Sequence, residues 1–400
     1  MNPGINTQQA RLWELATKLI SFDSVSDKSN RELVLYLADI LDATGAETHI
    51  VTDNVQGVEK LSLLAIRGPL DAEGFCLSGH TDVVPFEGQA GWKSNPLELK
   101  FDSGQATGRG ITDMKGFLAQ CAALFESIHR KNLRRNISLL FTSDEEVGVA
   151  GSKRLVERFS RSLPPFPLPR FAVIGEPTSL DIFRAHKSYG SALFEVRTKG
   201  GHSSRPDAGL NAILMAKEFL EILKRKNGEF LETTGKESYD LFPEFPHASI
   251  NIGTILGGIA DNMIADACRV TFSMRLLAGL CGDRLLIDLN EAFIERLREL
   301  HLIERVSFTL ESISNADPLN SPANSPLLVA LSRASGCNIS DVRGAPYATD
   351  GGNLKKLGID SYIWGPGVLS EAHQPNESMP IENMHRGFDI LQRLAIDYCC

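Results

Sequence analysis

Short apolar runs recur along the N-terminal half of the chain and again near its C-terminus. They occur in the stretches LSLLAIRG, GFCLSGH, ISLLFTSDEE, FAVIGEPT and DSYIWGPG. Segments with helical spacing of apolar positions separate them, among them MKGFLAQCAALFESIH. Fully apolar strands that alternate with amphipathic helices predict an α/β fold, with a mixed, largely parallel sheet flanked by helices.

The pattern changes from about His186. Strands with alternating apolar and polar positions follow, with two helices between them: SALFEVRTKG, NAILMAKEFLEILKRK, SINIGTILGG, ACRVTFSMRLL and RLLIDLNEAFIERLREL. After about Ser312 the α/β pattern returns, with a helix near SPLLVALSRASG. We therefore expect an inserted α+β domain at residues 186–311 and a discontinuous main domain at 1–185 and 312–400.

Composition narrows the class of protein. The 400 residues are 42% hydrophobic and 23% charged, which is typical of a globular chain. No apolar run approaches the roughly 20 residues that a bilayer requires, so we expect no membrane partner. Leu12, Leu15, Leu19 and Ile20 lie at helical spacing with charges between them, which predicts a core-facing helix and not a secretion signal.

Charge and cysteine content indicate the compartment and the partners. The formal net charge of −9 would repel a polyanion, so nucleic acid is not an expected partner. The seven cysteines are odd in number and include no CxxC pair, which argues against a disulfide framework and against a thiolate zinc site. A reducing cytoplasm is the expected location.

Side chains that commonly bind metals follow four of the predicted strands. His80 ends FCLSGH, Glu145 and Glu146 follow ISLLFTS, Glu176 follows FAVIG, and His373 comes after SYIWG. Each has an ordinary structural explanation on its own, such as an exposed acid in a turn. However, ligands bind at the carboxyl ends of the strands in open α/β sheets, so together these residues predict a metal site.

Asp113 lies in GRGITDMKGF, just before a predicted helix. Alone it would be a helix N-cap, but a site for two ions also needs a bridging carboxylate. Two histidines and several carboxylates suit two divalent ions, most commonly Zn²⁺, with Co²⁺ or Mn²⁺ as alternatives. We expect Asp113 to bridge the ions, His80 and Glu176 to complete one site, and Glu146 and His373 to complete the other.

The expected metal sites use only Glu146 of the acidic run TSDEEVG, which leaves Glu145 beside the metals but unligated. A carboxylate beside two cations can accept a proton from a metal-activated water, and Glu145 is the expected base. Asp82, two residues after His80, is expected to hold the second ring nitrogen of His80. Asp144 has no expected role and is interpreted as solvated.

Six motifs in this order give the chain a resemblance to a known family: SGHTDVVP, GRGITDMKGF, TSDEEVG, GEPT, GGHSSRP and EAHQPNE. They resemble the M20 family of di-zinc aminoacylases and peptidases over nearly the whole chain. The resemblance implies a zinc-aminopeptidase-like catalytic domain, the same metal and base residues, and a cis peptide bond between Asp113 and Met114. It also implies that the inserted domain serves as a lid and mediates homodimerisation.

Three residues of the inserted domain gain a role only through this resemblance. His202 of GGHSSRP matches a histidine that approaches the scissile carbonyl, often from the partner subunit. Without the resemblance, HSS would be interpreted as capping the helix that starts near Asn211. Asn262 and Arg275 match substrate-binding positions, and Arg275 is suited to bind a carboxylate through two hydrogen bonds.

The leading hypothesis is therefore a metal-dependent amide hydrolase that acts on a small acylated amino acid. Within the family, GEPTSLDIFRAHKSYG and SEAHQPNES are most similar to the branch that removes acetate from N-acetylornithine in arginine biosynthesis. Desuccinylation of succinyl-diaminopimelate, or cleavage of dipeptides and other acylated amino acids, are alternatives because they use the same metal ligands. A non-catalytic binding protein on the same fold is a third alternative.

Overall fold

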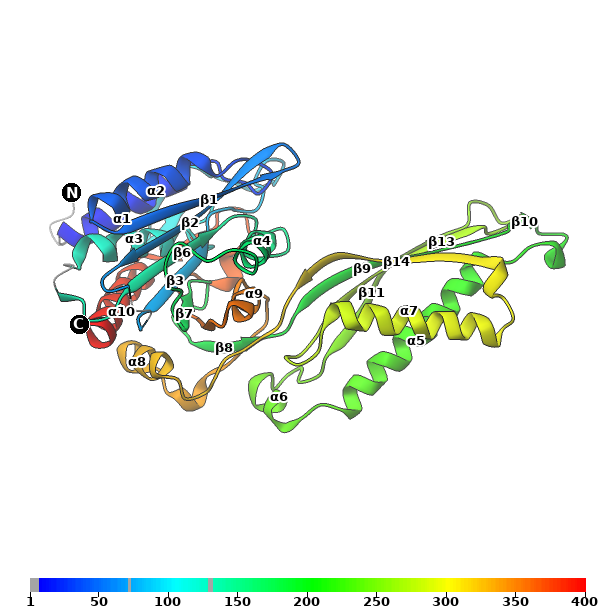
Figure 1. Ribbon diagram of the computed structural model, residues 1–400. Helices are drawn as coiled ribbons and strands as arrows, with labels where there is room; N and C mark the ends of the chain where they lie inside the picture. The colour runs from blue at the N-terminus through cyan, green and yellow to red at the C-terminus, as the bar shows by residue number, and fades with distance from the viewer. Residues whose placement is uncertain (1–6, 71–72, 129–131) are drawn as a thin grey trace. The chain divides into compact units, whose positions relative to one another are not determined.

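The computed structural model describes residues 7–70, 73–128 and 132–400, which form two compact units (Figure 1). The first unit contains the chain up to Ala185 with Asn320–Ala345 and Thr349–Cys400. The second unit contains His186–Leu319 and Pro346–Ala348. The main body is thus built from both ends of the chain.

A nine-stranded mixed sheet forms the centre of the first unit, which confirms the expected fold class. Its strands are β1 (Glu47–Val55), β2 (Val58–Arg67), β3 (Phe75–His80), β6 (Ile137–Thr142), β7 (Phe171–Ile174), β8 (Phe183–His186), β15 (Leu319–Asn320), β16 (Arg343–Ala345) and β17 (Asp360–Ile363). Their order is β1-β2-β6-β3-β7-β17-β8-β15, and β16 pairs with β8. The central strands β6, β3, β7 and β17 are parallel, so their carboxyl ends meet at one edge.

Helices cover both faces of this sheet, as the continuous apolar strands predict. They are α1 (Thr7–Ile20), α2 (Arg31–Ala43), α3 (Lys115–Ser127), α4 (Ala150–Phe159), α8 (Pro326–Ser335), α9 (Gly351–Leu354) and α10 (Ile381–Cys399). Alternate strand residues point to opposite faces: Leu77 packs in the cluster that includes α1, α3 and α10, and Cys76 packs in the cluster that includes α4 and α9. Of the helices described, none is long and apolar enough to cross a bilayer.

A small antiparallel sheet in the first unit joins two distant segments. It contains β4 (Lys100–Asp102), β5 (Gln105–Thr107) and β18 (Ser378–Pro380), in the order β18-β5-β4. Ser378 pairs with Thr107, which brings the chain after His373 beside the loop that leads to Asp113. Short 3₁₀ turns complete the unit: η4 (Ile339–Asp341), η5 (Lys355–Leu357) and η6 (Leu369–Glu371).

The second unit is an antiparallel sheet with two long helices on one face (Figure 1). Its elements are β9 (Tyr189–Thr198), β10 (Gly201–His202), η2 (Pro206–Ala208), α5 (Ala212–Glu232), α6 (Lys236–Leu241), β11 (Ser249–Gly257), β12 (Met263–Ile264), β13 (Ala267–Arg275), α7 (Gly282–Glu299), η3 (Ile303–Arg305) and β14 (Val306–Ala316). The main sheet has the order β11-β13-β9-β14, and β10 pairs with β12. The sequence did not predict β14, which spans the boundary expected at residues 311 and 312, so this unit extends to Leu319.

Aromatic rings form the core of the second unit. Phe194 of β9 stacks on Phe219 of α5 with ring centroids 3.9 Å apart, and Phe293 of α7 meets both rings edge-on. Every second residue along most of β9 is buried, as its alternating sequence predicts. These contacts fix both helices on the inner face of the sheet.

Candidate metal centre

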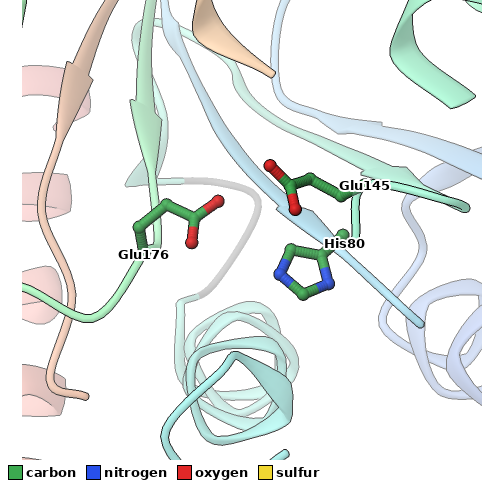
Figure 2. Close-up of side chains that lie close together, drawn as sticks. All are labelled: His80, Glu145 and Glu176. Carbon is green, nitrogen blue, oxygen red and sulfur yellow. The ribbon is translucent and has the colours of Figure 1, made fainter. Parts of the chain in front are cut away.

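Parallel strand ends bring three of the predicted site residues together. His80 is the last residue of β3 and pairs with Thr142, the last residue of β6, so the residues that follow β6 lie beside His80. Glu176 follows the neighbouring strand β7. One ligand atom from each of His80, Glu145 and Glu176 lies within 4.8 Å of the others, and Figure 2 shows the three side chains around a common space.

Asp113 lies between the two predicted histidine ligands. Its Oδ1 atom is 3.1 Å from Nε2 of His80, and its Oδ2 atom is 3.3 Å from Nε2 of His373. His373 Nε2 is also 3.1 Å from the carboxylate of Glu146. The peptide bond between Asp113 and Met114 is cis, as the family resemblance implies. The two oxygens of Asp113 thus face different halves of the cluster, which is the arrangement a bridging carboxylate needs.

Protonation of the histidines follows from their neighbours. Nδ1 of His80 is 3.0 Å from the backbone oxygen of Asp82, which can only accept, so Nδ1 carries the proton and Nε2 faces Asp113. Burial lowers the pKa of His80, but the contact with Asp113 and the surrounding negative charges outweigh it and raise this pKa well above its usual value. Hydrogen bonds to Asp113 and Glu146 raise the pKa of His373 to about 10. Both rings therefore lie where positive charge is favoured.

The neighbouring carboxylates repel one another inside the protein. Burial is the main cause that raises the pKa of Glu145, Glu146 and Glu176. The negative charge of Glu176 raises the pKa of Glu145 further. The negative charge of Asp113 does the same for Glu146 and Glu176. Oε1 of Glu176 is buried and has no hydrogen-bond partner among the described residues. A divalent cation would offset the repulsion between the carboxylates and would give Glu176 Oε1 a partner. A nitrogen and oxygen ligand set without thiolates suits zinc, cobalt or manganese.

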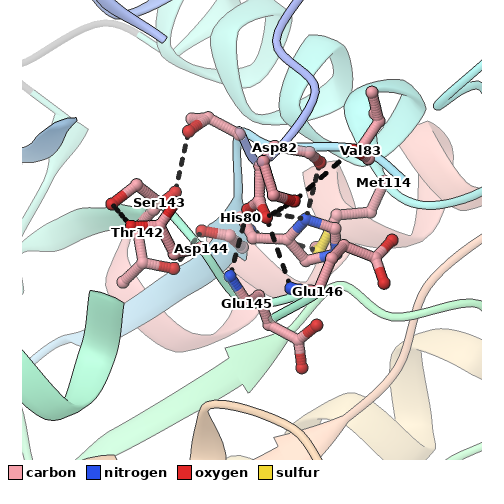
Figure 3. Close-up of polar contacts among 12 residues, drawn as sticks. His80, Asp82, Val83, Met114, Thr142, Ser143, Asp144, Glu145 and Glu146 are labelled. Atoms are coloured by element: carbon pink, nitrogen blue, oxygen red, sulfur yellow. Dashed lines mark hydrogen bonds and ion pairs between the residues drawn. The ribbon is translucent and has the colours of Figure 1, made fainter. Parts of the chain in front are cut away.

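Asp82 fixes the loop that carries Glu145 and Glu146 (Figure 3). Its carboxylate accepts hydrogen bonds from the backbone N–H groups of Glu145 at 3.1 Å and Glu146 at 3.3 Å, and from Ser26 Oγ at 2.7 Å. The same carboxylate is 3.6 Å from Nδ1 of His80, and the closer partner of that nitrogen is the Asp82 backbone oxygen. Asp82 therefore orients both the imidazole and the acidic loop.

The expectation that Asp144 is solvated is wrong. Its exposed fraction is 2%, and its carboxylate forms ion pairs with Lys60 and Arg154. Asp144 adopts a left-handed backbone conformation with φ of 56°, which aspartate tolerates better than most residues. Asp144 is therefore held by two basic side chains, although all three acids look equivalent in the sequence.

The sequence missed two buried acids next to the centre. Asp350 accepts a hydrogen bond from Thr142 Oγ1, and its charge contributes to the raised pKa of Glu145. Glu377 accepts hydrogen bonds from the loop that carries Asp113. Burial raises the pKa of Glu377 to about 7, and Arg109 opposes this rise. Both lie in stretches with a visible signal, ATDGG and EAHQPNE, but their burial depends on distant partners.

The remaining predicted residues lie in the second unit. His202 and Asn262 are neighbours, because β10 pairs with β12 and the Asn262 oxygen accepts a hydrogen bond from Ser203 N–H. The idea that HSS caps the next helix is wrong, since Asn211 caps α5 with its own side chain. Arg275 is at the end of β13 and stacks over the ring of Tyr189 at 4.5 Å. Arg275 is thus separated from His202 by the whole length of β13, about 26 Å.

Comparison with known proteins identifies the family. Residues 76–397 match the peptidase family M20/M25/M40. The chain belongs to this family. An acetylornithine deacetylase from Myxococcus xanthus is 32% identical over 390 residues, which cover 96% of each chain. One from Pasteurella multocida strain Pm70 is 30% identical over 381 residues, which cover 95% of this chain and 94% of the relative.

Solved structures of the M20 family share the fold. A metallo-carboxypeptidase from Sulfolobus solfataricus aligns with a TM-score of 0.76 at 15% identity, covering 98% of this chain and 99% of the other. A dinuclear metal-binding peptidase from Bacillus subtilis aligns with a TM-score of 0.62 at 14% identity, covering 98% of each chain. Family membership and the side chains gathered at the strand ends make this protein a metallohydrolase that acts on amides.

Proposed function

We propose that this protein hydrolyses N-acetylornithine to ornithine and acetate, a step in cytoplasmic arginine biosynthesis. The similarity to two acetylornithine deacetylases over almost the full chain carries the substrate assignment. The stretches HKSYG and EAHQPNE point to the same branch of the family. Peptide cleavage and desuccinylation are the competing activities, because they would use the same centre.

Two divalent ions, zinc by preference with cobalt or manganese as alternatives, are the proposed cofactors. Asp113 would bind both ions, His80 and Glu176 would hold the first, and Glu146 and His373 the second. The contacts of both Asp113 oxygens with different histidines support this division. When bound, such ions lower the pKa of a water molecule and polarise the substrate carbonyl.

Glu145 is the proposed general base. One ligand atom of Glu145 lies within 4.8 Å of those of His80 and Glu176, and a second such group contains His80, Asp113 and Glu146, so Glu145 lies directly beside the proposed metal ligands. Glu145 would take a proton from the attacking water and deliver it to the leaving amine nitrogen, so water and amide become acetate and ornithine. The two hydrogen bonds from its loop to Asp82 hold Glu145 in place for both transfers.

His202 is the proposed donor to the oxygen of the tetrahedral intermediate. Its Nδ1 atom accepts a hydrogen bond from the backbone N–H of Ser204 at 3.1 Å, so the proton of the neutral ring lies on Nε2. An exposed Nε2–H group is suited to approach a substrate carbonyl. The neighbouring Asn262 would bind the substrate beside it.

Arg275 is proposed to bind the substrate carboxylate. Because about 26 Å of β13 separates Arg275 from His202, one copy of the second unit cannot place both on one small substrate. The two residues would then come from different chains, with His202 reaching the site of its partner. A homodimer through the inserted domain is therefore part of the proposal.

The edge strand β11 supports such a dimer. It ends the order of the four-stranded sheet, and seven consecutive residues from Asn251 to Gly257 are exposed. Ile252, Ile255 and Leu256 are 41%, 48% and 69% exposed on this strand. An apolar strand with an open edge favours pairing with a second copy.

A substrate panel tests the proposed function. The purified protein, loaded with Zn²⁺ or Co²⁺, is assayed with N-acetylornithine, N-succinyl-diaminopimelate and dipeptides. We expect kcat/KM to be highest for N-acetylornithine by at least about tenfold. A higher value for the succinylated compound or for a dipeptide would replace this substrate assignment.

A further inference from the structure

Glu377 is a buried carboxylate whose contacts all lead to the loop that carries Asp113. Its Oε1 atom accepts hydrogen bonds from the backbone N–H groups of Thr112 at 2.9 Å and Asp113 at 3.1 Å. Its Oε2 atom accepts from Gly110 N–H at 2.9 Å and from the Arg109 guanidinium at 2.8 Å. Both oxygens of the carboxylate therefore accept hydrogen bonds from the same loop.

Arg109 continues this network toward His373. It is fully buried, contacts Glu377 with Nη1 and donates to Oε1 of Gln89 with Nη2, and its guanidinium lies 5.1 Å from the ring centre of Trp92. Gln89 in turn donates from Nε2 to the backbone oxygen of His373 at 2.8 Å. A chain of direct contacts thus joins the backbone of Asp113 to the backbone of His373.

The segment that carries His373 has an uncommon backbone conformation. His373 and Asn376 both have positive φ, 63° and 59°, which few non-glycine residues adopt, although asparagine and histidine adopt it more readily than most. The Asn376 side chain accepts from Lys93 N–H and donates to the Gly91 oxygen, each at 2.8 Å. The segment 373–377 is thereby fastened to residues 89–93 on one side and to the Asp113 loop on the other.

We propose that Glu377, acting through Arg109 and Gln89, is a positioning residue that sets the separation between Asp113 and His373. Neither Glu377 nor Arg109 touches a metal-binding atom in these contacts; they hold the backbone groups from which the two ligand side chains extend. Both oxygens of the Glu377 carboxylate accept hydrogen bonds and so hold the N–H groups of Gly110, Thr112 and Asp113 in fixed positions. Without the carboxylate, these N–H groups would lose this common partner. The inference rests on the proposed metal ligands.

Cobalt binding by the full chain tests this role without the need for turnover. In Glu377→Gln only one terminal atom can accept, so either the Thr112 and Asp113 N–H groups or the Gly110 N–H and Arg109 lose their partner. We expect cobalt, titrated by visible absorption, to bind about 10-fold to 100-fold more weakly and with an altered spectrum. Asp360→Asn is the matched control. Asp360 is a buried carboxylate of the same unit, but it is the first residue of β17 and so lies at the amino end of that strand, whereas the metal-binding residues follow the carboxyl ends of the parallel strands.

A second variant covers the case in which Glu377→Gln does not fold. Gln89 is only partly buried, and Gln89→Leu removes the contacts with both Arg109 and His373. We expect the same direction of change, with one of the two cobalt sites affected more than the other. Wild-type affinity and spectrum in a folded Glu377→Gln or Gln89→Leu protein would overturn the role.

The outcome is separable from that of the proposed function. If the wild-type chain binds two cobalt ions but does not hydrolyse N-acetylornithine, the substrate assignment fails while the cobalt comparison still decides the positioning role. If Asp360→Asn weakens cobalt binding as much as Glu377→Gln, general destabilisation explains both, and the role is rejected.

Discussion

Lys60 and Asp144 form an ion pair inside the first unit, with Nζ 2.9 Å from Oδ1 and both side chains at most 4% exposed. Lys60 also donates to the backbone oxygens of Ser26 and Lys28 at 2.6 and 2.7 Å. The ammonium thus joins the start of the acidic loop to the segment that precedes α2. Because Asp144 is adjacent to Glu145, this pair supports the proposed base.

Lys60→Met should destabilise the protein strongly. Removing one partner of a buried pair leaves the other charge without its counterion, which costs about 3 to 5 kcal/mol. Because Asp144 keeps its ion pair with Arg154, we expect a loss near the lower value. Chemical denaturation of the metal-free protein measures the loss. The double variant Lys60→Met with Asp144→Asn should lose less, because the orphaned charge is removed as well.

The exposed pair of Arg31 and Glu59 provides the control. Arg31→Met should change the free energy of unfolding by less than about 1 kcal/mol, as is usual for surface ion pairs. Equal losses for Lys60→Met and Arg31→Met would contradict a structural role for the buried pair.

Asp113→Asn should reduce the number of bound metal ions. Asparagine keeps the shape but offers one neutral oxygen, so it cannot bridge two cations as a carboxylate does. We expect fewer than two tightly bound ions per chain, measured by metal analysis after dialysis. Two ions retained with wild-type affinity would exclude Asp113 as the bridge.

Stability of the metal-free protein should fall as the pH rises. Burial raises the pKa of Glu145, Glu146 and Glu176, and carboxylate neighbours raise the pKa of His80 and His373, the latter to about 10. These five groups therefore bind more protons in the folded state than in the unfolded state, and the stability that these protons supply is lost as the pH passes through the folded-state values. Buried Lys115, whose pKa burial lowers to about 7, acts in the opposite direction. For His373 the window runs from about 6.5 to about 10.

The thermal midpoint of chelated and zinc-loaded protein, measured from pH 6 to pH 9, checks this expectation. Bound cations replace the protons, so the zinc-loaded midpoint should fall less and the gap between the two samples should widen with pH. Parallel curves would contradict a charge-driven metal site.

Mixing two inactive variants should restore activity if His202 acts on its partner's site. A dimer of one Glu145→Gln chain and one His202→Ala chain has one centre with an intact base and an intact lid histidine. After subunit exchange at equal amounts, about a quarter of wild-type activity should return, because half of the dimers are mixed and each has one working site. No recovery, despite confirmed mixing, would place both residues in the same chain.

The sequence predicted the parts of this protein whose chemistry is local. Continuous apolar strands predicted the central sheet, and ligand side chains directly after those strands predicted the cluster, because parallel strands end at a common edge. Asp144 shows the limit: it pairs with Lys60 and Arg154, whereas Glu145 lies within reach of His80 and Glu176. Nothing in the acidic run reveals which of its three acids pairs with basic side chains.

The sequence alone did not predict contacts between residues that lie far apart along the chain. Glu377 meets Asp113 across 264 positions of the chain, and Lys60 meets the acidic loop from another strand. Burial of a charged side chain depends on the counterion that the fold supplies, and a single sequence does not show that partner. EAHQPNE therefore indicated His373 and left Glu377 unassigned.

The most direct test is the Glu145→Gln variant, with bound metal and turnover measured on one preparation. Glutamine keeps the shape of the base and cannot carry the proton, so two ions should remain bound while kcat for N-acetylornithine falls about 10²-fold to 10⁴-fold. A variant that binds two ions and keeps kcat within about tenfold of wild type would contradict Glu145 as the base.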